Sequence, residues 1–160
     1  MASPRPLNSV IVGNGTLATS RRPRLNALPT FRELGGSHVV TLLSQKEGAR
    51  QLGSAVRSAG LEWTWTPLPH AGPPPTTHDG RLGASLTQLA AVLRDGGHVL
   101  IHCSAGIHRT GMFAYALLRF AGMTADDATD SLQRVDVDFL TNVGDDRLAW
   151  ANRLYATWHG

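Results

Sequence analysis

The stretch HVLIHCSAGIHRTG, residues 98–111, decides how the rest of the chain is interpreted. Its first five residues have an apolar centre and follow the turn sequence Asp-Gly-Gly, which predicts a short strand buried on both faces. The residues from Arg109 to about Phe120 predict a helix. A strand therefore leads into a helix through a short loop, CSAGIH, which carries the only cysteine of the chain.

The segments on either side of this stretch alternate between strand and helix patterns. Further strands are predicted at 9–12, 38–43 and 61–66, and further helices at 30–34, 44–59, 79–94, 124–135 and 145–158. Such alternation is typical of the α/β class, in which a mainly parallel central sheet is flanked by helices on both faces. Ligands of such sheets bind beyond the carboxyl ends of the strands, which is where the loop CSAGIH is expected to lie.

The bulk composition limits the possible classes of protein. A chain of 160 residues with 42% hydrophobic residues is expected to form a single domain, 1–160, with residues 1–8 flexible. One cysteine excludes an intramolecular disulfide and suits a reducing, cytoplasmic location. Neither a signal peptide nor an apolar run of about 18 residues is found, so membrane insertion is not expected. The net charge is +3, and the cluster Arg21, Arg22 and Arg24 is interpreted as a solvated loop rather than a nucleic-acid site.

The residue types in the loop indicate an anion-binding site with a nucleophile. The N-terminus of a helix exposes unpaired N–H groups and partial positive charge, and a loop that curls around it forms a nest of amides. Gly106 lets the backbone bend and approach a ligand, and Arg109 can grip two phosphate oxygens. A thiol in this field, Cys103, is expected to ionise and attack a bound phosphate, which gives a phosphocysteine intermediate.

Three neighbours of the loop receive supporting roles. The Thr110 hydroxyl can donate to the sulfur and help it to leave in a second step. His102 is a candidate for holding the loop backbone in shape, although a histidine satisfied at the end of its strand fits the pattern equally well. His108 stands at the mouth of the loop, where it could contact the substrate or face solvent.

The string HCSAGIHRTG matches the signature Cys-x5-Arg-[Ser/Thr] of the protein tyrosine phosphatase superfamily, and the length and layout resemble its compact dual-specificity branch. The resemblance implies the α/β phosphatase fold, phosphomonoester substrates and hydrolysis that needs no metal or other cofactor. It also implies Cys103 as nucleophile and Arg109 as phosphate binder. The cradle that it implies consists of the backbone amides of Ser104, Ala105, Gly106, Ile107, His108 and Arg109.

One element of the family pattern is missing. Members usually carry an Asp in a mobile loop about thirty residues before the cysteine, in a pattern like Pro-x-x-Asp-x-Gly-x-Pro. Here the matching stretch is PLPHAGPP, residues 67–74, with His70 where the Asp is expected. Three interpretations remain open: Asp79 later in the loop is the general acid, His70 is the acid, or the acid comes from the C-terminal part, such as Asp136 or Asp138, or is absent.

The leading functional hypothesis is a protein tyrosine or dual-specificity phosphatase, whose partner is a phosphorylated protein. One alternative is a phosphatase of small phosphorylated metabolites or nucleotides. Another is a phosphate-binding module with weak or no turnover, although binding alone needs no thiolate. Neither the physiological substrate nor the oligomeric state follows from the sequence.

Overall fold

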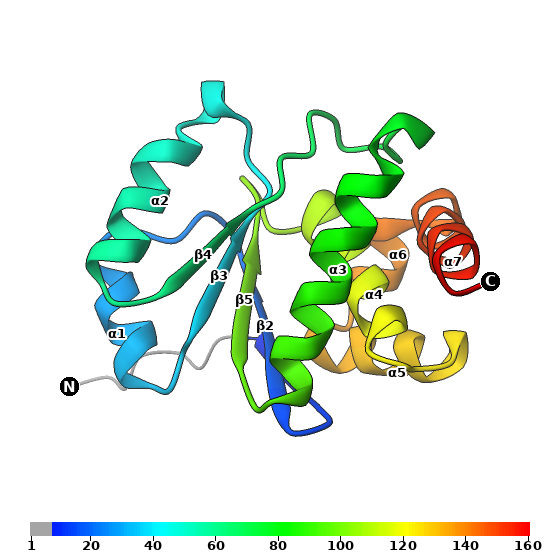
Figure 1. Cartoon of the computed structure of the whole chain (residues 1–160), viewed down its shortest axis with the longest axis horizontal. Helices are drawn as coiled ribbons and strands as arrows, with labels where there is room; N and C mark the ends of the chain where they lie inside the picture. The colour runs from blue at the N-terminus through cyan, green and yellow to red at the C-terminus, as the bar shows by residue number, and fades with distance from the viewer. Residues whose placement is uncertain (1–7) are drawn as a thin grey trace.

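The computed structural model describes residues 8–160, which form a five-stranded sheet between two layers of helices (Figure 1). The strand order is β1-β2-β5-β3-β4, in which β1 runs antiparallel to β2 and the other neighbours are parallel. The bounds are β1 (Asn8–Val12), β2 (Gly15–Ser20), β3 (His38–Thr41), β4 (Glu62–Trp65) and β5 (His98–His102). The predicted mainly parallel α/β architecture is therefore confirmed.

The helices divide between the two faces of the sheet. One face is covered by α1 (Ala27–Glu33) and α2 (Ala49–Ser58), the blue and cyan helices in Figure 1. On the other face lie α3 (Asp79–Arg94), α4 (His108–Phe120), α5 (Ala125–Val135), α6 (Phe139–Val143) and α7 (Asp145–His159). Two short 3-10 helices, η1 (Gln45–Glu47) and η2 (Thr76–His78), precede α2 and α3. Within residues 8–160 no helix has both the length and the apolar character needed to cross a membrane.

The central strand β5 is buried on both faces, as its apolar sequence predicts. Val99 and Ile101 join the larger apolar core with α3 and α4, whereas Leu100 joins the smaller core with α1 and α2. This division follows from the two-residue period of side chains along a strand. Helix α4 is almost entirely buried as well. The loop between β5 and α4 is therefore anchored at both ends by the most deeply buried elements.

Strand β2 was not predicted from the sequence. Its residues, GTLATS, contain few large apolar side chains, and a two-residue turn at Gly13-Asn14 joins them to β1. Gly13 has φ 60, as tight hairpin turns of this kind require. The strand exists because it is inserted between β1 and β5, where both neighbours complete its backbone hydrogen bonds. The predicted flexible segment, 1–8, is wrong for Asn8, which pairs with Thr19, and its other residues lie outside the described chain.

Other boundaries shift for local reasons. The region predicted as a helix over 44–59 is split at Gly48, whose φ of 88 separates η1 from α2. Helix α1 begins at Ala27 rather than at Thr30, so part of the predicted loop is helical. Helix α6 was missed because five residues are too few to show a helical period.

Candidate active site

The loop Cys103–Ile107 connects the carboxyl end of β5 to the N-terminus of α4. Gly106 has φ 75, and a Cβ at this position would lie 2.5 Å from the backbone nitrogen of Arg21, so both conformation and space require glycine. The backbone N–H of Arg22 donates to the carbonyl of Ser104 over 3.0 Å. The segment after β2 therefore braces the loop through its backbone, whereas the side chains of Arg21 and Arg22 are exposed, as predicted for a solvated loop.

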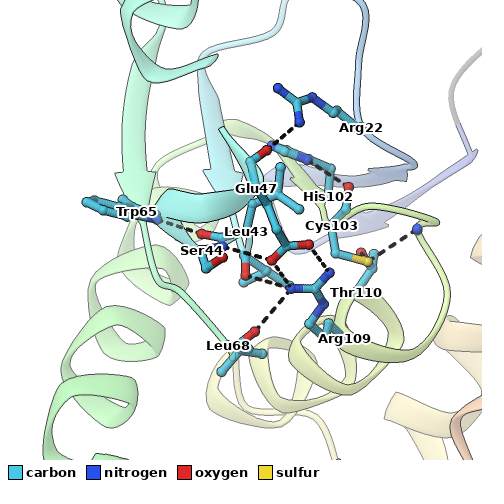
Figure 2. Close-up of polar contacts among 12 residues, drawn as sticks. Arg22, Leu43, Ser44, Glu47, Trp65, Leu68, His102, Cys103, Arg109 and Thr110 are labelled. Carbon is cyan, nitrogen blue, oxygen red and sulfur yellow. Dashed lines mark hydrogen bonds and ion pairs between the residues drawn. The ribbon is translucent and has the colours of Figure 1, made fainter. Parts of the chain in front are cut away.

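Cys103 is the first residue of this loop and is buried, with 3% of its surface exposed. Its Sγ accepts a hydrogen bond from the Gly106 N–H at 3.2 Å and another from the Thr110 hydroxyl at 3.1 Å (Figure 2). In general a thiolate accepts hydrogen bonds more strongly than a thiol. The loop and the first turn of α4 thus each supply one hydrogen-bond donor to the sulfur.

Arg109 is held by a carboxylate that the sequence did not point to. Its Nη1 and Nη2 donate to Oε1 and Oε2 of Glu47, each over 2.9 Å, and Nη1 also donates to the Leu68 carbonyl over 3.1 Å (Figure 2). The Glu47 carboxylate, and more weakly Cys103, raises the pKa of the guanidinium above its usual value. Nη1 also lies 3.5 Å from the Leu42 carbonyl oxygen. Among residues 8–160 these contacts engage both N–H groups of Nη1 and one of Nη2, which leaves the Nε N–H and one Nη2 N–H for a bound oxyanion.

Glu47 is fixed in turn by the local structure of η1. The backbone N–H of Ser44 donates to Glu47 Oε1 over 3.0 Å, as in a capping box, and the Arg22 guanidinium donates to the Glu47 carbonyl. Hydrogen bonding from Arg109 lowers the pKa of Glu47 to about 2 despite partial burial. The Ser-x-x-Glu spacing could have been detected as a capping signal, but nothing in it indicates an arginine 62 residues away.

His102 is completely buried beneath the loop. Its Nε2 lies 2.8 Å from the hydroxyl of Thr41, and its Nδ1 lies 3.2 Å from the carbonyl oxygen of Cys103. Burial, which outweighs the hydrogen bond to Cys103, lowers the pKa of His102 to about 4. The imidazole is therefore neutral at physiological pH, and it contacts the loop backbone at the residue that carries the sulfur.

The outer surface of the loop is open. Ser104, Ala105 and His108 are exposed, whereas Cys103 and Thr110 are buried. His108 is the first residue of α4 and is exposed.

The candidate acids occupy different positions. Asp79 begins α3, and its carboxylate binds Arg153 of α7 through two contacts of 3.0 and 3.2 Å. His70 is exposed and lies in the connection between β4 and η2. Leu68 lies in the same connection, two residues before His70, and its carbonyl accepts a hydrogen bond from Arg109.

Further contacts hold the same region in place. Arg147 of α7 donates to the Ala71 carbonyl, and Arg81 donates to that of Pro67 over 3.2 Å. The remaining candidates, Asp136 and Asp138, form a turn before α6, in which the Asp136 carboxylate accepts from the Asp138 N–H over 3.0 Å. The structure thus brings the connection that carries His70 to Arg109 through the Leu68 carbonyl, whereas the Asp79 carboxylate is engaged by Arg153 of α7.

Comparison with known proteins agrees with this geometry. Residues 74–131, which include α3, β5, the loop and α4, match the model of the tyrosine phosphatase family. No curated protein sequence matches the chain. The matched segment contains both Cys103 and Arg109.

Several solved phosphatase structures share the fold. Kinase-associated phosphatase, with its catalytic cysteine replaced by serine, superposes with a TM-score of 0.82 at 13% identity over 100% of this chain and 99% of its own. Tk-PTP in its active form superposes with a TM-score of 0.74 at 23% sequence identity, and the match covers 93% of this chain and 97% of Tk-PTP. TpbA of P. aeruginosa in complex with pTyr superposes with a TM-score of 0.62 at 21% sequence identity, and the match covers 100% of this chain and 95% of TpbA. The chain therefore shares the fold of these phosphatases, and its residues 74–131 are similar to the tyrosine phosphatase family.

Proposed function

We propose that this chain hydrolyses phosphomonoesters through a phosphocysteine on Cys103, with phosphotyrosine in proteins as the preferred substrate and phosphoserine or phosphothreonine as further ones. The observation that carries the proposal is the sulfur of Cys103, which accepts hydrogen bonds from Gly106 and Thr110 within a loop that faces Arg109. A site for binding alone would need the amides and the guanidinium but no buried nucleophile.

In the first step the Cys103 thiolate attacks phosphorus on the side opposite the ester oxygen. The S–P bond forms while the P–O bond to the leaving group breaks, and the leaving oxygen takes a proton from a general acid. The loop amides and the two donors of Arg109 not engaged by Glu47 and Leu68 stabilise the charge on the three remaining oxygens. Glu47 contributes by keeping the guanidinium in one orientation.

In the second step water attacks the phosphocysteine. The new O–P bond forms while the S–P bond breaks, the proton from water passes to the group that acted as acid, and inorganic phosphate leaves. The departing sulfur becomes a thiolate again, and the Thr110 hydroxyl at 3.1 Å supports this negative charge. Thr110 therefore acts mainly on the second step.

We assign the general acid to His70 rather than to Asp79. The support is positional: the carbonyl two residues before His70 accepts from Arg109, whereas the Asp79 carboxylate is bound by Arg153. An imidazole can donate a proton and then recover it, as a general acid in this reaction must do. Asp79 would first have to leave its ion pair in order to serve.

The test of the function is phosphate release from a phosphotyrosine peptide and from an aryl phosphate. The wild type is expected to turn over both, and Cys103→Ser to abolish turnover while it retains phosphate binding. Phosphoserine peptides and nucleoside monophosphates complete the panel, and a preference for nucleotides would favour a small-molecule phosphatase instead. If Cys103→Ser releases phosphate like the wild type, the proposed mechanism is wrong.

The test of the acid compares good and poor leaving groups. His70→Asn is expected to slow the hydrolysis of an alkyl phosphate far more than that of an aryl phosphate with an acidic phenol. The reason is that the alkoxide is the poor leaving group and needs the proton, whereas the phenoxide does not. Asp79→Asn serves as the matched variant. Should Asp79→Asn show this selective loss and His70→Asn not, Asp79 is the acid.

A further inference from the structure

A chain of hydrogen bonds connects the backbone of the nucleophile to a tryptophan on the edge strand. The indole N–H of Trp63 donates to the hydroxyl oxygen of Thr41 over 2.8 Å. The same oxygen lies 2.8 Å from Nε2 of His102, whose Nδ1 lies 3.2 Å from the Cys103 carbonyl oxygen. Thr41 and His102 are both completely buried. The residues come from three neighbouring strands, β4, β3 and β5.

The chemistry of the partners gives this chain one direction. A carbonyl oxygen can only accept, so Nδ1 of His102 carries the proton and Nε2 is an unprotonated acceptor. Thr41 must then donate its hydroxyl proton to Nε2. A hydroxyl that donates there can still accept from the indole of Trp63, which is a donor only. Every polar atom in the chain is thereby satisfied in a single arrangement.

The same residues occupy a face of the sheet that is otherwise apolar. Thr41 of β3 is paired with His102 of β5. Their side chains lie on the same face of the sheet as those of Val39 and Leu100, which belong to the smaller apolar core. Burying a hydroxyl and an imidazole costs free energy unless both are hydrogen-bonded. The arrangement therefore depends on each partner, because removing one leaves a buried polar atom without a hydrogen bond.

Helix α2 is shaped to admit the indole of Trp63. Gly53, in the interior of α2, is buried, and a Cβ there would lie 2.6 Å from the Trp63 ring. Glycine inside a helix is unfavourable by about 1 kcal/mol relative to alanine. The guanidinium of Arg57, one turn later, lies over the same ring at 5.2 Å from its centroid. Two features of α2 thus hold the indole in the place from which it donates to Thr41.

We propose that Trp63 and Thr41 are positioning residues for Cys103. They hold His102 in the tautomer protonated at Nδ1, and His102 in turn fixes the Cys103 carbonyl at the start of the loop Cys103–Ile107. This inference rests on the proposed phosphatase function for its kinetic consequence, but not for the tautomer. Without the Trp63 donor, the Thr41 hydroxyl is free to turn and accept from His102. A proton on Nε2 would then leave two lone pairs, Nδ1 and the carbonyl oxygen, facing each other.

The first test is spectroscopic and needs no substrate. Nitrogen-15 NMR of the imidazole in the wild type is expected to show His102 neutral with its proton on Nδ1. Trp63→Phe, which keeps an aromatic ring but removes the donor, is expected to populate the tautomer protonated at Nε2. A wild-type imidazole protonated at Nε2 would overturn the proposal even if the enzyme is active.

The second test measures kcat/KM on an aryl phosphate. Thr41→Val, which keeps the shape but removes the hydroxyl, is expected to lower kcat/KM about ten-fold, because His102 Nε2 is left buried without a donor. Thr41→Ser should restore most of the activity, since only the hydroxyl matters.

Two variants control for general loss of packing. Thr66→Val removes another fully buried hydroxyl, one that contacts Ser85 rather than the loop. Trp150→Phe removes a buried indole N–H that has no hydrogen-bond partner among residues 8–160. Both are expected to keep near-wild-type kcat/KM. If Thr41→Val and Trp63→Phe merely match these controls, the two residues do not position the nucleophile. Loss of function in Cys103→Ser tests the enzyme itself, so the two failures are distinguishable.

Discussion

Replacing Glu47 by glutamine removes the charge that orients Arg109 while keeping the side-chain shape. In the structure both guanidinium Nη atoms bind the carboxylate at 2.9 Å. The pKa of Glu47 falls from 4.5 to about 2 through these hydrogen bonds, which corresponds to at most about 3 kcal/mol of interaction in the folded state. Because the Glu47 side chain is 34% exposed, solvent screening reduces the expected loss of stability to about 1–2 kcal/mol.

The pH dependence identifies the source of this loss. A carboxyl with a lowered pKa in the folded state contributes its full stability above its unfolded value of 4.5. That contribution declines as the pH falls and is absent below about 2. Urea unfolding at pH 7 should therefore separate wild type and Glu47→Gln, and the two free energies of unfolding should converge as the pH approaches 2.

Catalysis should suffer more than stability does. A guanidinium that is free to swing grips the phosphate less often, so we expect kcat/KM on an aryl phosphate to fall about ten- to a hundred-fold. Arg153→Gln is the matched control, since it breaks the more exposed ion pair with Asp79 and should cost less than about 1 kcal/mol without a change in kcat/KM. A stability gap that is the same at pH 7 and pH 2.5, or unaltered kinetics in Glu47→Gln, would refute the assignment.

Three further predictions concern the loop and its support. Thr110→Val should slow breakdown of the phosphocysteine about ten-fold or more while its formation changes little, because the lost hydrogen bond to Sγ stabilises the departing thiolate; rapid-quench kinetics should show a burst of released phenol. Gly106→Ala should abolish turnover and weaken vanadate binding in titrations, because a Cβ would lie 2.5 Å from the Arg21 nitrogen at φ 75; wild-type binding would show that the loop tolerates a side chain. His102, whose pKa is lowered to about 4 by burial, should contribute stability that is complete above pH 6.5 and lost as the pH falls to 4; His102→Gln should show a smaller loss of unfolding free energy across that range, and an equal loss would contradict the assignment.

The strand, loop and helix around Cys103 were predictable because the information is local. An apolar strand, a glycine-containing loop and a helix N-terminus follow one another within residues 98–120, and the spacing of Cys103 and Arg109 lies in the same segment. Helix α3 was equally clear, since Leu82, Leu86 and other buried leucines recur at helical spacing. In these elements the pattern that forms the secondary structure also states which face is buried.

Contacts between distant segments could not be predicted in this way. Strand β2 has little pattern of its own and is a strand because β1 and β5 lie on either side of it. The choice between His70 and Asp79 was left open by the sequence, and only the packing of α7 against α3 places Arg153 on Asp79.

The sequence by itself determined the residues of the candidate site: a thiol, an arginine and a glycine-containing loop at the start of one helix. The tertiary structure decided what holds that chemistry in place, namely Glu47 on Arg109, and Thr41 with Trp63 on His102. The reason is that parallel strands far apart in the chain end at the same edge of the sheet. Side chains that meet there have no fixed separation in sequence, so their contacts cannot be predicted from a periodicity or a motif.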